Sequence, residues 1–267
     1  MKAMIFAAGL GTRLKPLTDN IPKALVPLAG KTLLQWQIER LKAAGIIEIV
    51  VNVHHFPDMI INYLRENDNF GCRISVSDER DMLLETGGGL RKAKNLLIGN
   101  ENWELNNEEE PILVCNVDIL SNIDIPALLK AYNPEEMGVV VVSERNTQRY
   151  LLFDSTNHLC GWTNIATEEV KPDSLSEKIK TENGQLRTED SILSMYAFSG
   201  MQVLNPRIFS TMDKVIAEKG EKFSLIDLYL SIADKEILRA FIPENYRMMD
   251  VGKINQLSEA EAFAQAL

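Results

Sequence analysis

Basic residues with the chemistry to bind phosphate gather near the start of the chain. Between residues 11 and 31 a single acid, Asp19, is outnumbered by four basic residues: Arg13, Lys15, Lys23 and Lys31. Residues 7–28 also hold two glycines and three prolines. Glycine lets successive N–H groups point at an anion, and proline fixes φ, so the segment is both open and stiff. It predicts a preorganised binding loop for a polyphosphate.

Two better-known phosphate motifs do not fit this loop. In "GLGTRL" (9–14) the third glycine of G-x-G-x-x-G is replaced by Leu14, and no helix is expected directly after it. "AGKT" (29–32) ends like a P-loop, but G-x-x-x-x-G-K-[ST] would need a glycine where Leu25 stands. Dinucleotide binding of the Rossmann type and a P-loop NTPase or kinase are therefore excluded.

Composition limits the partners of the protein. The chain has 267 residues, 45% hydrophobic, and a net charge of −10, which argues against nucleic acid or an anionic membrane as the main partner. No segment is apolar enough to span a bilayer or to act as a signal peptide. The three cysteines, Cys72, Cys115 and Cys160, lack metal-binding spacing and read as reduced thiols. These features predict a soluble, cytoplasmic protein.

Apolar runs alternate with helix-like segments in the first half of the chain. Strands are expected at 3–8, 48–53 and 72–77, and helices at 31–45 and 56–67. This alternation is typical of βαβ units and predicts an α/β fold with a mostly parallel sheet. The absence of a linker predicts a single domain over residues 1–267.

The second half of the chain gives a less regular pattern. Residues 111–120 predict one buried strand, residues 149–162 a hairpin that places Trp162 in the core or beside a substrate, and residues 167–190 an exposed excursion or lid. The segment 101–110 is acidic and predicts a solvated loop. Further strands are expected at 137–144, 191–200, 236–242 and 246–252, and further helices at 222–234 and 253–265.

The opening loop also carries a family resemblance. "AAGLGTRLKPLTDNIPKALVPLAGKTLL" (7–34) resembles the signature G-x-G-T-R-x-x-P-L-T-x-x-x-P-K-x-L-x-P of sugar-1-phosphate nucleotidyltransferases. Similarity continues through "EIVVNVHHFPDMI", "LLETGGGLRKA", "LVCNVDIL", "FSGMQVLNP" and "YRMMDVG". Within the family, "LLETGGG" and the short chain look most like N-acetylmuramate-1-phosphate uridylyltransferases, with mannose-1-phosphate guanylyltransferases close behind.

The resemblance implies a fold and a reaction. The implied fold is Rossmann-like, three-layer α/β/α with a mixed, mostly parallel central sheet, in which residues 1–120 bind the nucleotide and residues 121–267 the sugar. The implied reaction joins a nucleoside triphosphate, UTP or GTP, to a sugar 1-phosphate and releases pyrophosphate; a heptose 1-phosphate is a further candidate acceptor. A homo-oligomer is compatible with this. A non-catalytic regulatory subunit of the same fold is the alternative, although such domains tend to lose the basic and acidic site residues that this chain keeps.

The resemblance also implies which residues bind the triphosphate and the metal. Arg13 has the planar fork for the departing phosphates, and Lys23 the point charge for the α-phosphate and the sugar phosphate. Asp118 and Asp250 match metal-binding aspartates, and two carboxylates suffice for Mg²⁺. Val117 departs from the usual glycine before the first aspartate. The remaining implied nucleotide contacts are Ala8, Gly9, Gly11, Thr12, Glu85, Thr86 and Asn116.

The implied sugar contacts are Gly88, which would leave room for the sugar nucleotide, and Ser199 with Gly200. The "ETGGG" segment (85–89) would lie against the base, although a plain glycine-rich helix start explains it as well. The neighbouring His54 and His55 point apart in an extended segment, so we expect a structural or substrate-contacting role rather than a metal site.

Overall fold

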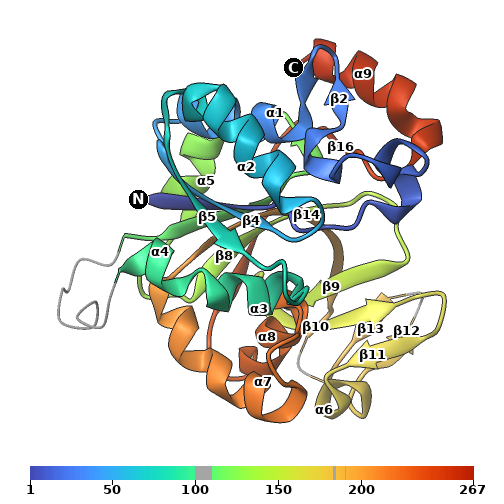
Figure 1. The fold of residues 1–267 in the computed structure, drawn as a ribbon. Helices are drawn as coiled ribbons and strands as arrows, with labels where there is room; N and C mark the ends of the chain where they lie inside the picture. The colour runs from blue at the N-terminus through green and yellow to red at the C-terminus, as the bar shows by residue number, and fades with distance from the viewer. Residues whose placement is uncertain (100–109, 183–184, 190) are drawn as a thin grey trace.

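A computed structural model describes residues 1–99, 110–182, 185–189 and 191–267. Its central element is a ten-stranded mixed sheet with the order β11-β10-β9-β14-β6-β1-β4-β5, while β8 pairs with β14 and β15 with β8 (Figure 1). The strands of this sheet are β1 (Lys2–Phe6), β4 (Glu48–Val53), β5 (Arg73–Asp78), β6 (Ile112–Asn116), β8 (Gly138–Ser143), β9 (Arg149–Phe153), β10 (Leu159–Asn164), β11 (Glu169–Lys171), β14 (Ser194–Leu204) and β15 (Leu238–Phe241).

The first half of the chain builds the parallel part of the sheet. β1 pairs in parallel with β4 on one side and with β6 on the other, and β4 pairs in parallel with β5. Met4 and Ile5 are fully buried, as expected for a strand covered by helices on both faces. The carboxyl ends of β1, β4 and β6 therefore meet at one edge, where ligands of α/β sheets bind.

Helices cover both faces of the sheet, so that the molecule has three layers (Figure 1). Two buried apolar clusters, one on each face, form the core. The helices packed on the first cluster are α1 (Leu33–Ala43), α2 (Pro57–Glu66), α5 (Ile125–Ala131) and α9 (Leu257–Gln265). Those packed on the second are α3 (Glu85–Lys92), α4 (Lys94–Ile98), α7 (Met212–Lys219) and α8 (Leu225–Ile232). The predicted α/β architecture is thus confirmed.

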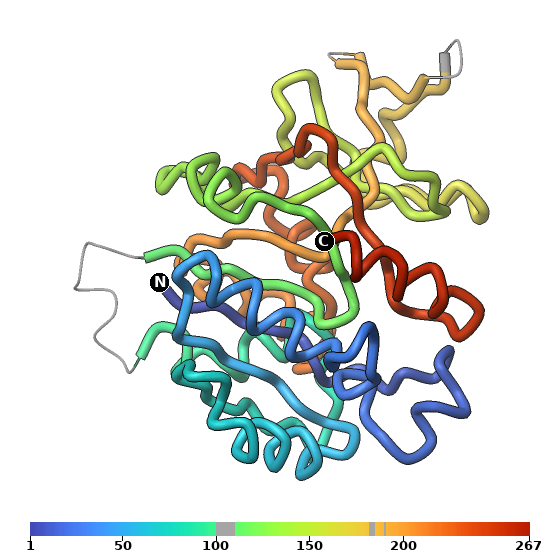
Figure 2. Tube along the Cα trace, turned by 90° about the horizontal axis from the view of Figure 1, so that it is seen from above, coloured from blue at the N-terminus to red at the C-terminus, as the bar shows by residue number. Residues whose placement is uncertain are grey.

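The expected helices begin later than the sequence pattern indicated. α1 starts at Leu33, because the Thr32 side chain accepts the Gln35 N–H at 3.1 Å and caps the helix there. α8 starts at Leu225 because Ser224 and Asp227 form a capping box. Figures 1 and 2 both show α9 beside β2 (Pro27–Leu28), which pairs with β3 (Lys31–Thr32) at the end of the opening loop.

The antiparallel part of the sheet comes from residues after 118. β14 pairs antiparallel with β6, β8 and β9, and an irregularity between Phe198 and Gln202 lets one long strand serve all three. β9 and β10 form the expected hairpin, in which Trp162 packs against the second core cluster. The strand expected at 191–200 continues to Leu204 because its last residues pair with both β6 and β8.

The polar segment 167–190 has secondary structure of its own. It contains β11, the short α6 (Asp173–Ser176) and the hairpin of β12 (Lys180–Glu182) and β13 (Gln185–Arg187), and it lies at one end of the molecule (Figure 2). Leu175 packs with Leu152 and Leu193 in a small separate cluster. Of the acidic loop expected at 101–110, all but Glu110 lies outside the described residues.

The prediction of one strand over 111–120 was wrong in a way that matters for the site. β6 ends at Asn116, a turn follows at Val117 and Asp118, and a separate strand, β7 (Ile119–Ser121), then leaves the main sheet. β7 pairs antiparallel with β16 (Met248–Asp250). In the ranges described above, no helix combines the length and apolar character needed to cross a lipid bilayer.

Candidate active site

The opening loop leaves β1 at the carboxyl edge of the sheet and turns sharply at Gly11. Gly11 has φ +66°, and a Cβ there would lie 2.9 Å from Thr18 Cγ2. The Gly11 carbonyl accepts hydrogen bonds from the Leu14 N–H and from the Thr18 hydroxyl, both at 2.8 Å. The turn therefore requires glycine, both for its left-handed backbone and for the close approach of Thr18.

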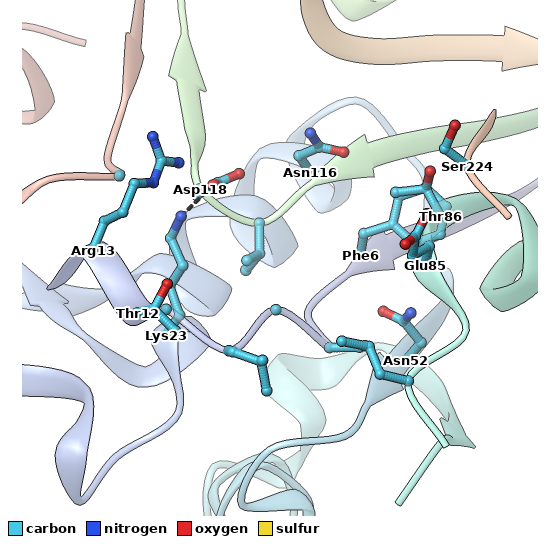
Figure 3. Close-up of a pocket in the computed structure, with 17 residues that line it drawn as sticks. Phe6, Thr12, Arg13, Lys23, Asn52, Glu85, Thr86, Asn116, Asp118 and Ser224 are labelled. Carbon is cyan, nitrogen blue, oxygen red and sulfur yellow. Dashed lines mark hydrogen bonds and ion pairs between the residues drawn. The ribbon is translucent and has the colours of Figure 1, made fainter. Parts of the chain in front are cut away.

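Lys23 is held against Asp118 inside this loop. Residue 23 is only 7% exposed, and its Nζ forms an ion pair with Oδ2 of Asp118 (Figure 3). Asp118 lies in the turn after β6, which places its carboxylate across from the loop. The structure thus brings together one cation and one anion that the sequence resemblance had assigned to the same reaction centre.

Asp250 joins this pair through the β7–β16 pairing. Asp250 stands opposite Ile119, and the Val251 N–H donates to the Asp118 carbonyl at 2.9 Å. Burial raises the pKa of Asp250, and the neighbouring charge of Asp118 raises it further, whereas Lys23 and Arg13 oppose the shift. The two aspartates are therefore close enough to repel each other.

The two carboxylates fit a hard divalent cation. Oδ1 of Asp250 is buried and accepts no hydrogen bond from any residue the structure describes. A buried carboxylate oxygen without a donor, next to a second carboxylate, is suited to Mg²⁺, which prefers oxygen ligands and keeps several waters. Across the same described ranges, no group of three or more His, Cys, Asp or Glu residues could form an all-protein metal site.

Arg13 comes close to Asp250 at Gly252. A Cβ added at Gly252 would lie 2.9 Å from Arg13 Nη2 and 2.7 Å from Asp250 Oδ1, so the guanidinium and the carboxylate both border Gly252. Arg13 is exposed, and its fork is free to turn toward a ligand. Glycine at position 252 leaves the space that these two side chains occupy.

Arg13, Lys23 and Asp118 border one cavity of about 560 Å³, whereas Asp250 is next to them but is not one of its lining residues. Figure 3 shows Thr12, Arg13, Lys23 and Asp118 along one side of it and Glu85, Thr86 and Ser224 along the other. The sequence-predicted residues that line the cavity are Ala8, Gly9, Gly11, Thr12, Arg13, Lys23, Glu85, Thr86, Asn116 and Asp118. One wall therefore carries Arg13, Lys23 and Asp118, and the opposite wall is formed by Glu85, Thr86 and Ser224.

The wall opposite the charges is the start of α3. Glu85 has φ +62°, and Oγ1 of Thr86 accepts the Leu225 N–H at 2.9 Å, which ties α3 to α8. The Thr86 hydroxyl thus already has a structural partner while its residue lines the cavity.

Gly88 lies away from this cavity. Its N–H and that of Gly87 donate to the Phe223 carbonyl at 3.1 and 2.9 Å, and a Cβ on Gly88 would lie 2.1 Å from the Glu221 carbonyl oxygen. Close packing of α3 on residues 221–223 therefore explains the glycine at position 88. Gly88 does not line the cavity, so it is not part of the sugar site that we propose.

Ser199 and Gly200 also lie outside the cavity lining. Ser199 is fully buried and its hydroxyl donates to Ser143 Oγ at 3.2 Å. Gly200 has φ +74°, and a Cβ there would lie 2.6 Å from Ile119 and 3.5 Å from Asn116 Nδ2. Gly200 packs closely against Ile119 of β7 and Asn116, and the Ser199 hydroxyl is already hydrogen-bonded. Neither residue therefore presents a free side chain to a ligand.

The structure adds cavity residues that the sequence prediction missed. They are Phe6, Leu10, Asn52, Leu83, Ser224 and Gly252, together with Val117, which had been noted only as a departure from the family pattern. Asn52 had a usable signal, because it is the second-last residue of the strand next to β1 and stands opposite Phe6 near the carboxyl edge of the sheet. Val117 is 4% exposed and packs in the first core cluster.

The remaining candidate residues have structural partners. His54 Nδ1 lies 2.7 Å from the Glu79 carbonyl oxygen, and the His55 ring packs on Phe56. The three cysteines are free thiols, and burial raises the pKa of Cys115 to about 11. A low reactivity of this thiol follows.

The fold and the site define the chain as an α/β protein whose cavity presents Arg13 and Lys23 beside the carboxylate of Asp118. The family model described as "Nucleotidyl transferase" matches residues 2–266, so the chain belongs to the nucleotidyl transferase family.

Two relatives whose activities are named are similar to this chain over part of its length. The chain is 41% identical over 159 residues to N-acetylmuramate alpha-1-phosphate uridylyltransferase of Caulobacter vibrioides, a match that covers 57% of this chain and 62% of that protein. It is 34% identical over 160 residues to probable mannose-1-phosphate guanylyltransferase 3 of Oryza sativa, covering 54% and 42%. The chain thus spans less than two thirds of these relatives' length.

A solved structure agrees on the fold. A putative glucose-1-phosphate thymidylyltransferase from Bacillus anthracis superimposes with a TM-score of 0.75 at 17% identity, over 100% of this chain and 96% of that one. At this identity the likeness extends to the fold alone.

Proposed function

We propose that this chain is a sugar-1-phosphate nucleotidyltransferase. It joins a nucleoside triphosphate and a sugar 1-phosphate to give a nucleotide sugar and pyrophosphate. The observation that carries the proposal is the convergence of Arg13, Lys23 and Asp118 at one end of a single cavity, with Asp250 next to them at Gly252. Membership of the nucleotidyl transferase family supports the same reaction.

The reaction requires two polyanions to meet in line. An oxygen of the sugar phosphate attacks the α-phosphorus, and the bond from that phosphorus to the β-phosphate bridging oxygen breaks as pyrophosphate leaves. Two unit charges about 4 Å apart repel by about 4 kcal/mol at an effective dielectric near 20. Catalysis therefore consists mainly of charge neutralisation and positioning.

Lys23 and Arg13 would act on different phosphates because they lie at different depths in the site. Lys23 lies deep in the loop and can neutralise the α-phosphate and the incoming phosphate, whereas the exposed fork of Arg13 suits the departing β- and γ-phosphates. Asp118 and Asp250 would hold Mg²⁺ and, with it bound, the ion would supply positive charge to the phosphates. In its absence, Lys23 balances the charge of Asp118.

For the substrates we propose uridylyl transfer to N-acetylmuramate 1-phosphate or a related hexose 1-phosphate, supported by the relative at 41% identity. An additional cation favours an acidic sugar. Nη2 of Arg145 donates to the Phe198 carbonyl at 3.1 Å, beside Ser199, and its charge opposes the burial that raises the pKa of Asp250 and of Tyr246. Guanylyl transfer to a mannose or heptose 1-phosphate is the alternative, supported by the guanylyltransferase relative.

A pyrophosphate-release panel tests the proposal. UTP, GTP and the other common nucleoside triphosphates are crossed with muramic, glucosyl, glucosaminyl, mannosyl and heptosyl 1-phosphates, with Mg²⁺ and with a chelator. We expect turnover with Mg²⁺ and a preference for UTP with N-acetylmuramate 1-phosphate. If no pair reacts with Mg²⁺ present, the protein is a non-catalytic member of the family and the proposal is wrong.

A further inference from the structure

A buried polar bridge connects the two walls of the cavity. Oδ1 of Asn52 accepts the Ala7 N–H at 2.7 Å, and Nδ2 of Asn52 donates to Oε1 of Glu79 at 2.7 Å. Oε2 of Glu79 then accepts the Leu84 N–H at 3.3 Å. Asn52 is 2% exposed and Glu79 is fully buried, so water does not replace these partners.

The ends of the bridge are where the two walls begin. Ala7 directly precedes the cavity residues Ala8 to Arg13, and Leu84 directly precedes Glu85 and Thr86. Gly89 of α3 covers the bridge, since a Cβ there would lie 2.8 Å from Glu79 Oε1 and 3.0 Å from Asn52 Nδ2. Two side chains thus connect the phosphate loop to the base-side wall.

We propose that Asn52 and Glu79 are positioning residues that fix the distance between the phosphate loop and the start of α3, and so preorganise the cavity for the nucleotide. The inference rests on the proposed function in that the ligand is a nucleoside triphosphate. Neither side chain is needed for the chemistry itself, because both act through the backbone N–H groups of Ala7 and Leu84.

The direction of every hydrogen bond in the bridge is determined by its ends. Both ends are backbone N–H donors, so the two side chains must together supply three acceptors and one donor. An asparagine and an ionised glutamate meet this requirement, whereas a protonated Glu79 supplies one donor too many. Burial raises the pKa of Glu79, while hydrogen bonds from Asn52 and Leu84 oppose that shift.

This requirement gives a test in which the substituted side chains keep the shape of the originals and only their hydrogen-bond donors and acceptors change. Glu79→Gln leaves two donors facing each other somewhere in the bridge, and Asn52→Asp leaves two acceptors facing each other. The double variant Asn52→Asp/Glu79→Gln restores three acceptors and one donor, with the inner hydrogen bond reversed. A role that depended only on packing would leave all three variants like the wild type.

Two measurements report whether the bridge is intact. The first is hydrogen exchange at the Ala7 and Leu84 amides without nucleotide, and the second is the Kd for UTP and GTP without sugar phosphate. A misdirected bond is relieved by moving the loop or α3, so each single variant should bind nucleotide on the order of tenfold more weakly and lose protection at one of these amides. The double variant should bind within about threefold of the wild type.

Asn205→Asp is the matched control. Asn205 is 3% exposed, its Nδ2 donates to the Pro134 carbonyl at 2.9 Å and its Oδ1 accepts the Arg207 N–H at 2.9 Å, away from the cavity. This substitution also turns a buried donor into an acceptor, and it should leave the nucleotide Kd unchanged.

Every outcome of these measurements either supports or contradicts the positioning role of Asn52 and Glu79. Wild-type Kd values and protection in the single variants would contradict the inference, as would a double variant no better than its parents. If the single variants do not fold, the double variant must still fold and bind, and its failure would also overturn the bridge. If the wild type binds neither nucleotide, the proposed function fails, and amide exchange still tests the bridge.

Discussion

Replacing Lys23 by alanine should abolish most turnover without unfolding the protein. The side chain is 9% exposed and faces Asp118, which is 21% exposed, so its charge acts in a partly desolvated space. One charge at about 4 Å contributes about 4 kcal/mol at an effective dielectric near 20. Since about 1.4 kcal/mol corresponds to tenfold in rate, Lys23→Ala should lower kcat/KM by about a thousandfold.

The assay is steady-state pyrophosphate release, with circular dichroism to confirm the fold. Lys15→Ala is the matched control, because Lys15 belongs to the same loop, is 59% exposed and forms a surface ion pair with the exposed Asp19 at 3.1 Å. It should change kcat/KM by less than about threefold, as surface ion pairs contribute little. A folded Lys23→Ala variant that keeps kcat/KM within tenfold of the wild type would refute the charge-neutralisation reasoning.

Three further substitutions test other parts of the structure. Gly88→Ala should destabilise the protein by about 2–4 kcal/mol in urea unfolding, because its Cβ would lie 2.1 Å from a backbone oxygen. Arg239→Gln should cost about 1–2 kcal/mol at neutral pH, since Arg239 holds the pKa of Glu136 below its usual value. The wild-type advantage should fall as pH drops from about 4.5 through that lowered pKa. Arg145→Gln should raise the KM for N-acetylmuramate 1-phosphate about tenfold and leave that for neutral hexose 1-phosphates unchanged.

Each of these has an outcome that would contradict it. Gly9→Ala, where a Cβ meets nothing within 4 Å, should keep wild-type stability, and an equal loss there would show that the Gly88 packing is not the cause. A stability difference between wild type and Arg239→Gln that stays constant down to pH 3 would exclude the Glu136 pair. Equal KM changes for acidic and neutral sugars would remove the role assigned to Arg145.

Local chemistry made the opening loop predictable from the sequence. Gly11, Arg13 and Lys23 lie within one short segment, so their types and spacing predicted one common site, and the structure brings them to one cavity. The alternation of buried strands and amphipathic helices predicted the parallel half of the sheet for a similar reason, because each βαβ unit is local in sequence.

Features that depend on packing between distant segments could not be predicted from the sequence in the same way. The break of strand 111–120 at Val117 depends on pairing between β7 and the distant β16. The glycine at 88 is explained by the backbone of Glu221, which no local pattern reveals. The position of Asn52 near the end of a strand was a signal for the cavity edge, but its bridging role depends on Ala7 and Glu79, each more than twenty positions away.

The three-residue ladder between β7 and β16 has a consequence for how the protein matures. Asp118 emerges from the ribosome long before Asp250, and only the late docking of residues 248–250 on 119–121 supplies the second carboxylate. A nascent chain that has already folded its parallel half can thus shape the loop around Lys23 but lacks a complete acidic pair. The proposed acidic pair therefore forms only after residues 248–250 have been synthesised and have paired with β7.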